Sequence, residues 1–375
     1  MLAKEELLFR FLPKAIKPPV TFCFSKDSVS ELQYSDIWFI RHHRFWSCHP
    51  WLRIVTDDGN KSENKLLSWG LTEADVNQKD YDFYVSNVEV KENIFSIKES
   101  EISIFKASLL IRTIIRLSGF VFTEEGLKGG LSSFYNDSIN AEVLHFRNFW
   151  KDTIYKKIES KNHSFYEQIL SLYERIKTFF RSVDYVGAYS SVSSNNTIND
   201  EILYNFGYMI LLAYGVFEDF AWIINNGEQL DLKKEKIGLR SNINGNGILP
   251  HLEKHYEPYF KLISTNEFQS MLNFIFLLRS HLVHRNYIKS YSYGILGESY
   301  EKGMISLSLN DYNRNEITNN VQNGIFSETL YIVENSNRLS IDPFAFAARL
   351  LYELTLFIDR FSLLGQEIIK NRYGG

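Results

Sequence analysis

The sequence predicts a mainly α-helical protein made of an α+β domain over residues 1–188 and an all-α helical bundle over residues 201–375. In the second half, apolar residues recur every three or four positions along three long segments, which is the period of amphipathic helices. In the first half, short apolar runs alternate with helical segments. Residues 189–200 are rich in Ser and Asn, which favour turns, so they are predicted to be a linker.

Composition limits the class of protein. The 375 residues are 45% hydrophobic and 23% charged, which suffices for a buried core and suits two domains. Cys23 and Cys48 are the two cysteines, so a disulfide framework is not expected. Residues 1–13 do not resemble a signal peptide, and no run of about 18 apolar residues is present. These features predict a cytoplasmic protein without a membrane partner.

The charge balance argues against broad, nonspecific binding of nucleic acid. Residues 1–199 contain 25 basic and 25 acidic side chains, and residues 200–375 contain 16 and 20, which gives the net charge of −4. A protein of this charge can still act on RNA if a few arginines meet the phosphate locally.

Both halves contain predicted elements. Residues 164–183 have a capping-box start, in which Ser164 is the expected N-cap and Glu167 follows three residues later. The last long helix starts at Asp342, an N-cap, with Pro343 at the first helical position. The expected strands lie at 38–40, 83–90 and 95–97, and the expected helices at 101–117, 139–159, 164–183, 201–225, 267–287 and 342–368. Residues 291–340 are polar and are expected to form an insertion with short strands.

The chemistry is expected near the end of the helix at 267–287. There the sequence reads Arg-Ser-His-Leu-Val-His from Arg279 to His284, followed by Arg285 and Asn286. This segment resembles the Arg-x4–6-His motif of the HEPN superfamily. The resemblance implies a metal-independent ribonuclease in which the 2′-hydroxyl attacks the adjacent phosphate, leaving a 2′,3′-cyclic phosphate and a 5′-hydroxyl. It assigns catalysis to Arg279 and His284, with no cofactor and no metal.

These residue types suit that reaction. Histidine can take and give protons near neutral pH because its ordinary pKa is about 6.5. An arginine is always charged and can hold two phosphoryl oxygens at once. Five residues on an ideal helix rotate by about 140° and rise by about 7.5 Å, so Arg279 and His284 do not share one face. A composite site at a two-fold axis would resolve this, and the motif therefore also predicts a homodimer.

A second match lies in the helix at 201–225. Residues 214–220 resemble the first long HEPN helix, where an acidic residue often lies near the catalytic pair. Glu218 could therefore orient His284 or Arg279; the alternative is that Glu218 and Asp219 both lie at an ordinary solvated edge of the helix. The residue after the motif arginine is commonly Asn, Asp or His in active members; here it is Ser280, and His281 could take over part of its role. The expected supporting residues are Glu218, Ser280, His281, Arg285 and Asn286.

The family resemblance also suggests a biological role. Two-domain bacterial HEPN proteins of this size are often toxins or anti-phage effectors of abortive infection that cut host RNA such as tRNA, and residues 1–188 would then sense a trigger. The alternative is a noncatalytic HEPN-like module that binds a protein, nucleotide or RNA partner. A third reading is the RNA-binding half of a toxin–antitoxin or guide complex. Residues 41–49 interleave basic and aromatic side chains, as in single-strand binding platforms, or as in an aromatic core strand.

Overall fold

The computed structural model of the chain divides into two compact units, Met1–Leu144 and His145–Gly375. Each unit is a separate body with its own core. The described residues are 20–25, 52–56, 81–86, 101–103, 107, 135–136, 139, 143–190, 194–241, 247–283, 288–294, 301–308, 314–332 and 337–374.

The described part of the N-terminal unit is a parallel sheet with strand order β2-β1-β3-β4. Phe22 and Phe83 are buried and stack with their ring centroids 5.3 Å apart. Burial of this kind is typical of parallel strands. The strands are β1 (Val20–Phe24), β2 (Leu52–Thr56), β3 (Phe83–Ser86) and β4 (Glu101–Ser103).

Two sequence predictions can be compared with this sheet. The extended run predicted at 83–90 contains β3, whereas the runs at 38–40 and 95–97 lie outside the described residues. The helix predicted at 101–117 is wrong at its start, because residues 101–103 form β4. Glu101 is exposed and Ile102 is buried, as expected for alternating side chains on a strand. The helical spacing of the apolar residues that follow does not extend back to these positions.

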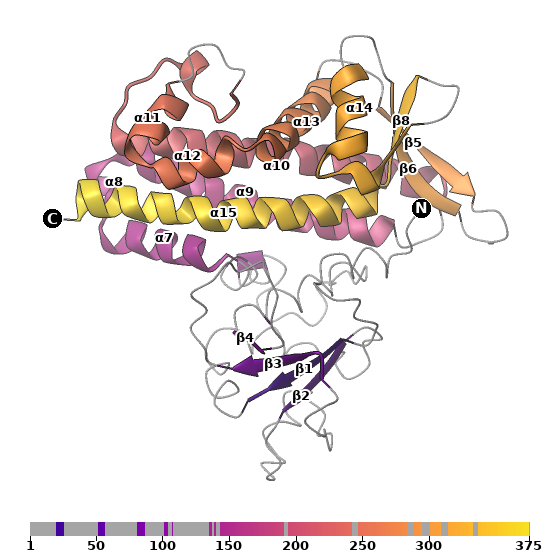
Figure 1. Cartoon of the computed structure of the whole chain (residues 1–375), viewed down its shortest axis with the longest axis horizontal. Coiled ribbons are helices and arrows are strands. Elements are labelled where there is room, and N and C mark those ends of the chain that lie inside the picture. The colour runs from indigo at the N-terminus through magenta and orange to yellow at the C-terminus, as the bar shows by residue number, and fades with distance from the viewer. Residues whose placement is uncertain are drawn as a thin grey trace. The chain divides into compact units, whose positions relative to one another are not determined.

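The C-terminal unit is mainly helical, as predicted for this half. The three longest helices, α9, α10 and α15, run alongside one another (Figure 1). The helices of this unit are α7 (Leu144–Tyr155), α8 (Ile158–Lys161), α9 (His163–Tyr189), α10 (Asn196–Glu228), α11 (Ile248–His255), α12 (Glu257–Ile263), α13 (Asn266–Val283), α14 (Arg314–Asn323) and α15 (Pro343–Tyr373), with short 3-10 turns η2 (Lys234–Lys236) and η3 (Ser327–Thr329).

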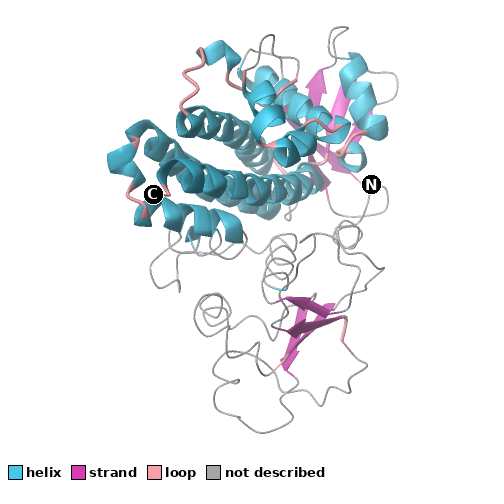
Figure 2. Cartoon of the chain, turned by 60° about the vertical axis from the view of Figure 1, so that its left-hand side comes forward, coloured by secondary structure: helices cyan, strands magenta, loops and turns pink. Residues whose placement is uncertain are grey.

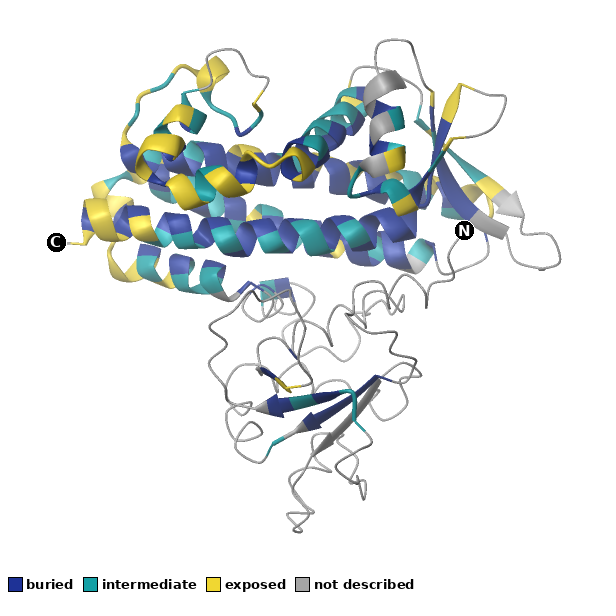
Figure 3. Ribbon diagram, in the orientation of Figure 1, coloured by how far each residue is buried: buried dark blue, intermediate teal, exposed yellow. Residues whose placement is uncertain are grey.

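Helix α10 is the centre of this unit. It packs against α9, α15, α13 and α11, and also against strands of a small sheet. Buried residues run along α10 and α15 (Figure 3). Among the described residues, α10 is the one helix long and apolar enough to cross a membrane, but most of its apolar window is buried inside the bundle. That burial is typical of the core helix of a soluble protein.

The division into units differs from the predicted boundary at 189–200. Helix α9 ends at Tyr189, Asn195 caps α10 with its side chain, and the two helices then pack along each other. Residues 145–188 therefore belong to the helical unit, and the Ser- and Asn-rich segment joins two helices of one bundle. The polar composition identified a turn but not its place in the domain organisation.

Two predicted helix starts have different outcomes. The start at Asp342 is confirmed, because its Oδ1 accepts the backbone N–H of Ala345 at 3.2 Å and Pro343 follows it. The cap predicted at Ser164 is wrong, because Asn162 Oδ1 accepts the N–H of Phe165 at 3.0 Å and the helix begins at His163. Asn162 also donates to the Tyr373 hydroxyl at 2.9 Å, so a tertiary contact supports the earlier start.

The predicted short strands of the insertion at 291–340 are present. They form an antiparallel sheet of order β5-β6-β8-β7 that contacts α10. Figure 2 shows its strands, in magenta, beside the helices of this unit. Asn199 of α10 donates to the Ser292 hydroxyl of β5 at 3.0 Å, which joins the sheet to the bundle. The strands are β5 (Ile288–Gly294), β6 (Glu301–Ser308), β7 (Leu330–Ile332) and β8 (Arg338–Ile341).

Candidate functional site

Arg279 lies in the last part of α13 and faces α10. Its guanidinium carbon is 4.9 Å from the ring centroid of Tyr214, the geometry of a cation–π contact. The Tyr214 ring also contacts Phe276, with centroids 5.6 Å apart. The half-buried Arg279 side chain is therefore held between two helices, while α13 itself ends four residues later at Val283.

A second arginine, Arg240, lies beside the first. Its guanidinium carbon is 3.6 Å from the ring centroid of Phe276, and its Nε donates to the Asn273 side chain at 3.0 Å. It also forms a hydrogen bond with Tyr214. Arg240 comes from the segment before α11, which has no helical period, so the sequence offered no signal for it.

Two of the predicted site residues, Glu218 and Arg279, both affect the pKa of Tyr214. Burial raises the pKa of Tyr214, the Glu218 carboxylate raises it further, and the Arg240 and Arg279 guanidinium groups act in the opposite direction. Glu218 and Arg279 thus act on the same side chain from two helices. Glu218 is exposed, and the described contacts do not include a direct one between it and Arg279.

Asp219, next in sequence, is buried and paired. This contradicts the prediction of a solvated edge. Its Oδ2 accepts Nε of Arg175 at 2.7 Å and its Oδ1 accepts the Gln168 amide at 2.6 Å, both from α9. Burial raises the pKa of Asp219 to about 6, although the Arg175 hydrogen bond and charge act to lower it. Burial destabilises the charged form of Asp219 by more than Arg175 and Gln168 stabilise it.

Gly215 makes this pairing possible. A β-carbon at position 215 would lie 2.2 Å from Nη1 and 2.6 Å from Cζ of Arg175, so the guanidinium occupies the space that any other side chain would need. A glycine inside an apolar helix often marks such a close approach. That glycine indicates in the sequence that some residue approaches α10 closely, but not which residue it is.

The other predicted residues have varied positions. Ser280 is half-buried, and His281 is buried on the inner side of α13, where burial lowers its pKa and favours the neutral ring. His281 therefore lies within the core and does not accompany Arg279. His284, Arg285 and Asn286 lie outside the described residues, as does the basic and aromatic segment 41–49.

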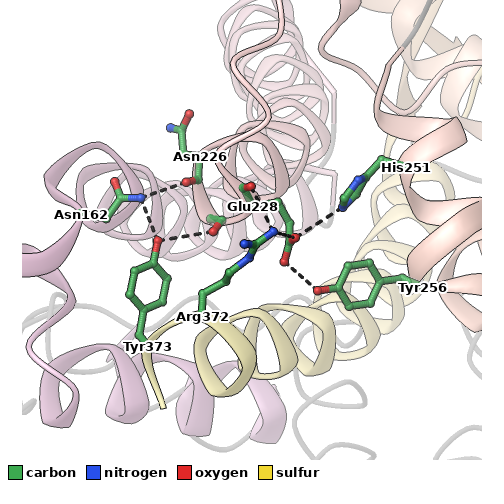
Figure 4. Close-up of polar contacts among 8 residues, drawn as sticks. Asn162, Asn226, Glu228, His251, Tyr256, Arg372 and Tyr373 are labelled. Carbon is green, nitrogen blue, oxygen red and sulfur yellow. Dashed lines mark hydrogen bonds and ion pairs between the residues drawn. The ribbon is translucent and has the colours of Figure 1, made fainter. Parts of the chain in front are cut away.

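A second polar cluster lies at the C-terminal end of α10 and centres on Glu228 (Figure 4). The buried carboxylate accepts the Tyr256 hydroxyl at 2.7 Å and Nη2 of Arg372 at 2.9 Å, and His251 Nε2 lies 3.6 Å away. These partners come from α11, the start of α12 and α15, so one carboxylate joins four helices. Nothing in the sequence pattern singled out this cluster.

The charges of the Glu228 cluster suit a structural role. Burial opposes ionisation of Glu228, but hydrogen bonds from Arg372 and Tyr256 outweigh it and keep its pKa below the usual range. Burial and the bond to Glu228 raise the pKa of Tyr256 to about 12, so this hydroxyl stays protonated. Burial also lowers the pKa of His251. At neutral pH the cluster is a fixed ion pair with a neutral histidine beside it.

Within the described part of the chain, no group of three or more His, Cys, Asp and Glu side chains is placed to hold an ion. His251 and His255 lie one helical turn apart, with ring centroids separated by 4.8 Å. Lys254 and Arg372 lower the pKa of His251 through their positive charge, and the same charge opposes the binding of a cation beside this histidine.

The Glu228 cluster gives a stability prediction. Glu228→Gln should lower the free energy of unfolding by about 2 kcal/mol, because it weakens the charged hydrogen bonds to Tyr256 and Arg372. Urea unfolding at pH 7 measures this. Glu257→Gln is the matched control, since Glu257 forms an exposed pair with Lys261 and its loss should change stability little. Equal effects of both substitutions would contradict a central role for Glu228.

Asp219 gives a pH prediction. Its pKa in the folded protein, about 6, is above the value of 3.8 expected after unfolding, so the folded state holds the proton more tightly. The resulting stability is complete below about pH 4 and is lost as pH rises through about 6. Relative to Asp219→Asn, the wild type should lose roughly 3 kcal/mol between about pH 3 and pH 7. If the free energy of unfolding changes with pH in the same way for both proteins, the raised pKa of Asp219 is refuted.

Comparisons with known proteins do not assign this chain to a family. The chain matches no family model, no curated protein and no solved structure.

Proposed function

We propose that the C-terminal unit is a metal-independent endoribonuclease of the HEPN type, in which Arg279 binds the phosphate that is attacked and His284 transfers protons. The observation that supports the proposal is the placement of Arg279 against Tyr214 of α10, with Arg240 beside it and Arg175 against Gly215, the next residue of α10. In a unit with net negative charge, these guanidinium groups are a local site for an anion.

The chemistry follows from these side chains. Arg279 can present two N–H donors to the phosphoryl oxygens, where negative charge increases during attack by the 2′-hydroxyl. The Tyr214 ring limits how far the guanidinium can move. His284 directly follows the last residue of α13, so a short segment joins the proton-transfer group to the phosphate-binding group. The proton leaves the 2′-hydroxyl, another is supplied to the departing 5′-oxygen, and no metal takes part.

The proposal includes a homodimer. Tyr204, Tyr208 and Leu211 are exposed on one side of α10 and are here named the α10 stripe. Val283 is also exposed and lies one turn after Arg279 on the same face of α13. Exposed apolar groups that follow one another in this way are typical of interfaces. A second copy covering them would bring two Arg279 side chains to a shared axis.

The biological part of the proposal comes from the family resemblance. We infer a cytoplasmic toxin or anti-phage effector that cuts host RNA such as tRNA, with the N-terminal unit responding to a trigger. The noncatalytic interaction module is the alternative, and it predicts partner binding without cleavage.

The first test of the nuclease is RNA cleavage by the purified protein with EDTA present throughout. Wild type should cut RNA and leave 2′,3′-cyclic phosphate ends. Arg279→Ala and His284→Ala should each lower the rate by about a hundredfold or more, because they remove charge stabilisation and proton transfer. If all three proteins behave alike, or if EDTA abolishes cleavage, the ribonuclease is rejected and the interaction module is favoured.

The dimer has its own test. Wild type should have the mass of a dimer by light scattering, and the double substitution Tyr208→Glu and Leu211→Glu should give a monomer with little cleavage. Tyr155→Glu is the matched control, because Tyr155 is a 79% exposed tyrosine on α7 and away from the α10 stripe. A monomeric wild type, or a double variant that stays dimeric, would contradict this interface.

A further inference from the structure

Arg175 is a charged residue that the motif did not include, and it reaches from α9 across the surface of α10. About a third of its side chain is exposed, whereas the Asp219 carboxylate that holds it is buried. Its guanidinium lies on the backbone of Gly215, in space that no other residue type at position 215 would leave. This placement therefore depends on three residues from two helices.

The pairing with Asp219 leaves donors available. Asp219 accepts a single bond from Arg175, through Nε, because its second oxygen is taken by Gln168. Neither Nη nitrogen of Arg175 has a hydrogen-bond acceptor among the described residues. An arginine that serves only to fix a buried carboxylate commonly uses two parallel bonds. Here Asp219 holds the guanidinium through Nε and Nη1 lies against Gly215, while the exposed third of the side chain stays available to a ligand.

Arg175 and Arg279 contact neighbouring residues of α10. Gly215 is adjacent to Tyr214, so Arg175 from α9 and Arg279 from α13 approach the same turn of α10 from its two sides. The exposed Glu218 lies on the α10 surface between them. Glu218 is the one acidic side chain exposed on this turn, since Asp219 is buried and paired. A ligand crossing α10 here would meet a guanidinium on each side.

We propose that Arg175 binds a backbone phosphate of single-stranded RNA, neighbouring the phosphate bound by Arg279. This inference rests on the proposed function and extends it to how the substrate lies across α10. The planar guanidinium suits two phosphate oxygens, and its fixed inner side lowers the entropic cost of binding. Arg175 is a substrate-binding residue in this arrangement, and the reacting atoms remain at Arg279 and His284.

The experiment measures binding of a short fluorescent single-stranded RNA by anisotropy over a range of salt concentrations, together with kcat and KM. Arg175→Gln should weaken binding between about tenfold and a hundredfold, and raise KM with kcat largely kept. The slope of log K against log salt should fall by about 0.7, the value for one phosphate contact on a single strand. Arg175→Lys should recover part of the affinity.

Two further proteins control this test. Arg181→Gln removes an equal charge from an exposed position on the same helix and should leave binding nearly unchanged. Because Arg175→Gln leaves Asp219 buried with one partner fewer, the double variant Arg175→Gln with Asp219→Asn removes both charges. If it folds and binds RNA as weakly as the single variant, the effect comes from the lost cation and not from a damaged fold.

The outcomes separate this inference from the proposed nuclease. Unchanged RNA binding in both Arg175 variants, with cleavage still dependent on Arg279, overturns the role of Arg175 and leaves the nuclease in place. Weakened binding in these variants, with no cleavage by any protein, supports the phosphate contact and rejects the nuclease. A wild type that neither binds nor cuts the RNA overturns both.

Discussion

A helix of 33 residues whose apolar side chains point in nearly every direction has to be covered on most of its circumference. Helix α10 is covered by α9, α15 and α13, with α11 at one end and the small sheet beside its N-terminal part. Its neighbours approach closely where α10 has glycine: Leu282 lies over Gly207 and Arg175 over Gly215. Burial of α10 thus determines which residues of the surrounding helices can meet.

The two acidic groups buried along α10 are compensated in different ways. Glu228 receives enough hydrogen bonds and positive charge to stay ionised despite its burial. Asp219 has one guanidinium and one amide, and its pKa stays raised. Glu228 therefore joins helices through a complete set of contacts, whereas Asp219 orients an arginine that retains further donors. The difference lies in the balance between burial and partners, because burial is the larger effect at Asp219 and the hydrogen bonds and positive charge together are the larger effect at Glu228.

Local signals in the sequence predicted local structure well and tertiary contacts poorly. Apolar periodicity gave the long helices, and Asp342 with Pro343 gave one helix start, because neighbours in the chain decide both. The cap at Asn162 depends partly on Tyr373, more than two hundred residues away, and no spacing rule contains that contact. Of the candidate site, Arg279 could be found from its motif. Arg175 and Arg240 could not, because folding alone brings them to α10.

The short connection between α9 and α10 has a consequence for how this protein can be divided. A fragment starting at the Ser- and Asn-rich segment would look like a complete helical domain by composition. It would nevertheless expose the side of α10 that α9 covers and leave Asp219 without both of its partners. It would also lose α7, whose His145 hydrogen-bonds to Asp359 of α15. The smallest autonomous piece of the C-terminal half therefore begins near residue 144, and domain exchange or truncation has to respect that limit.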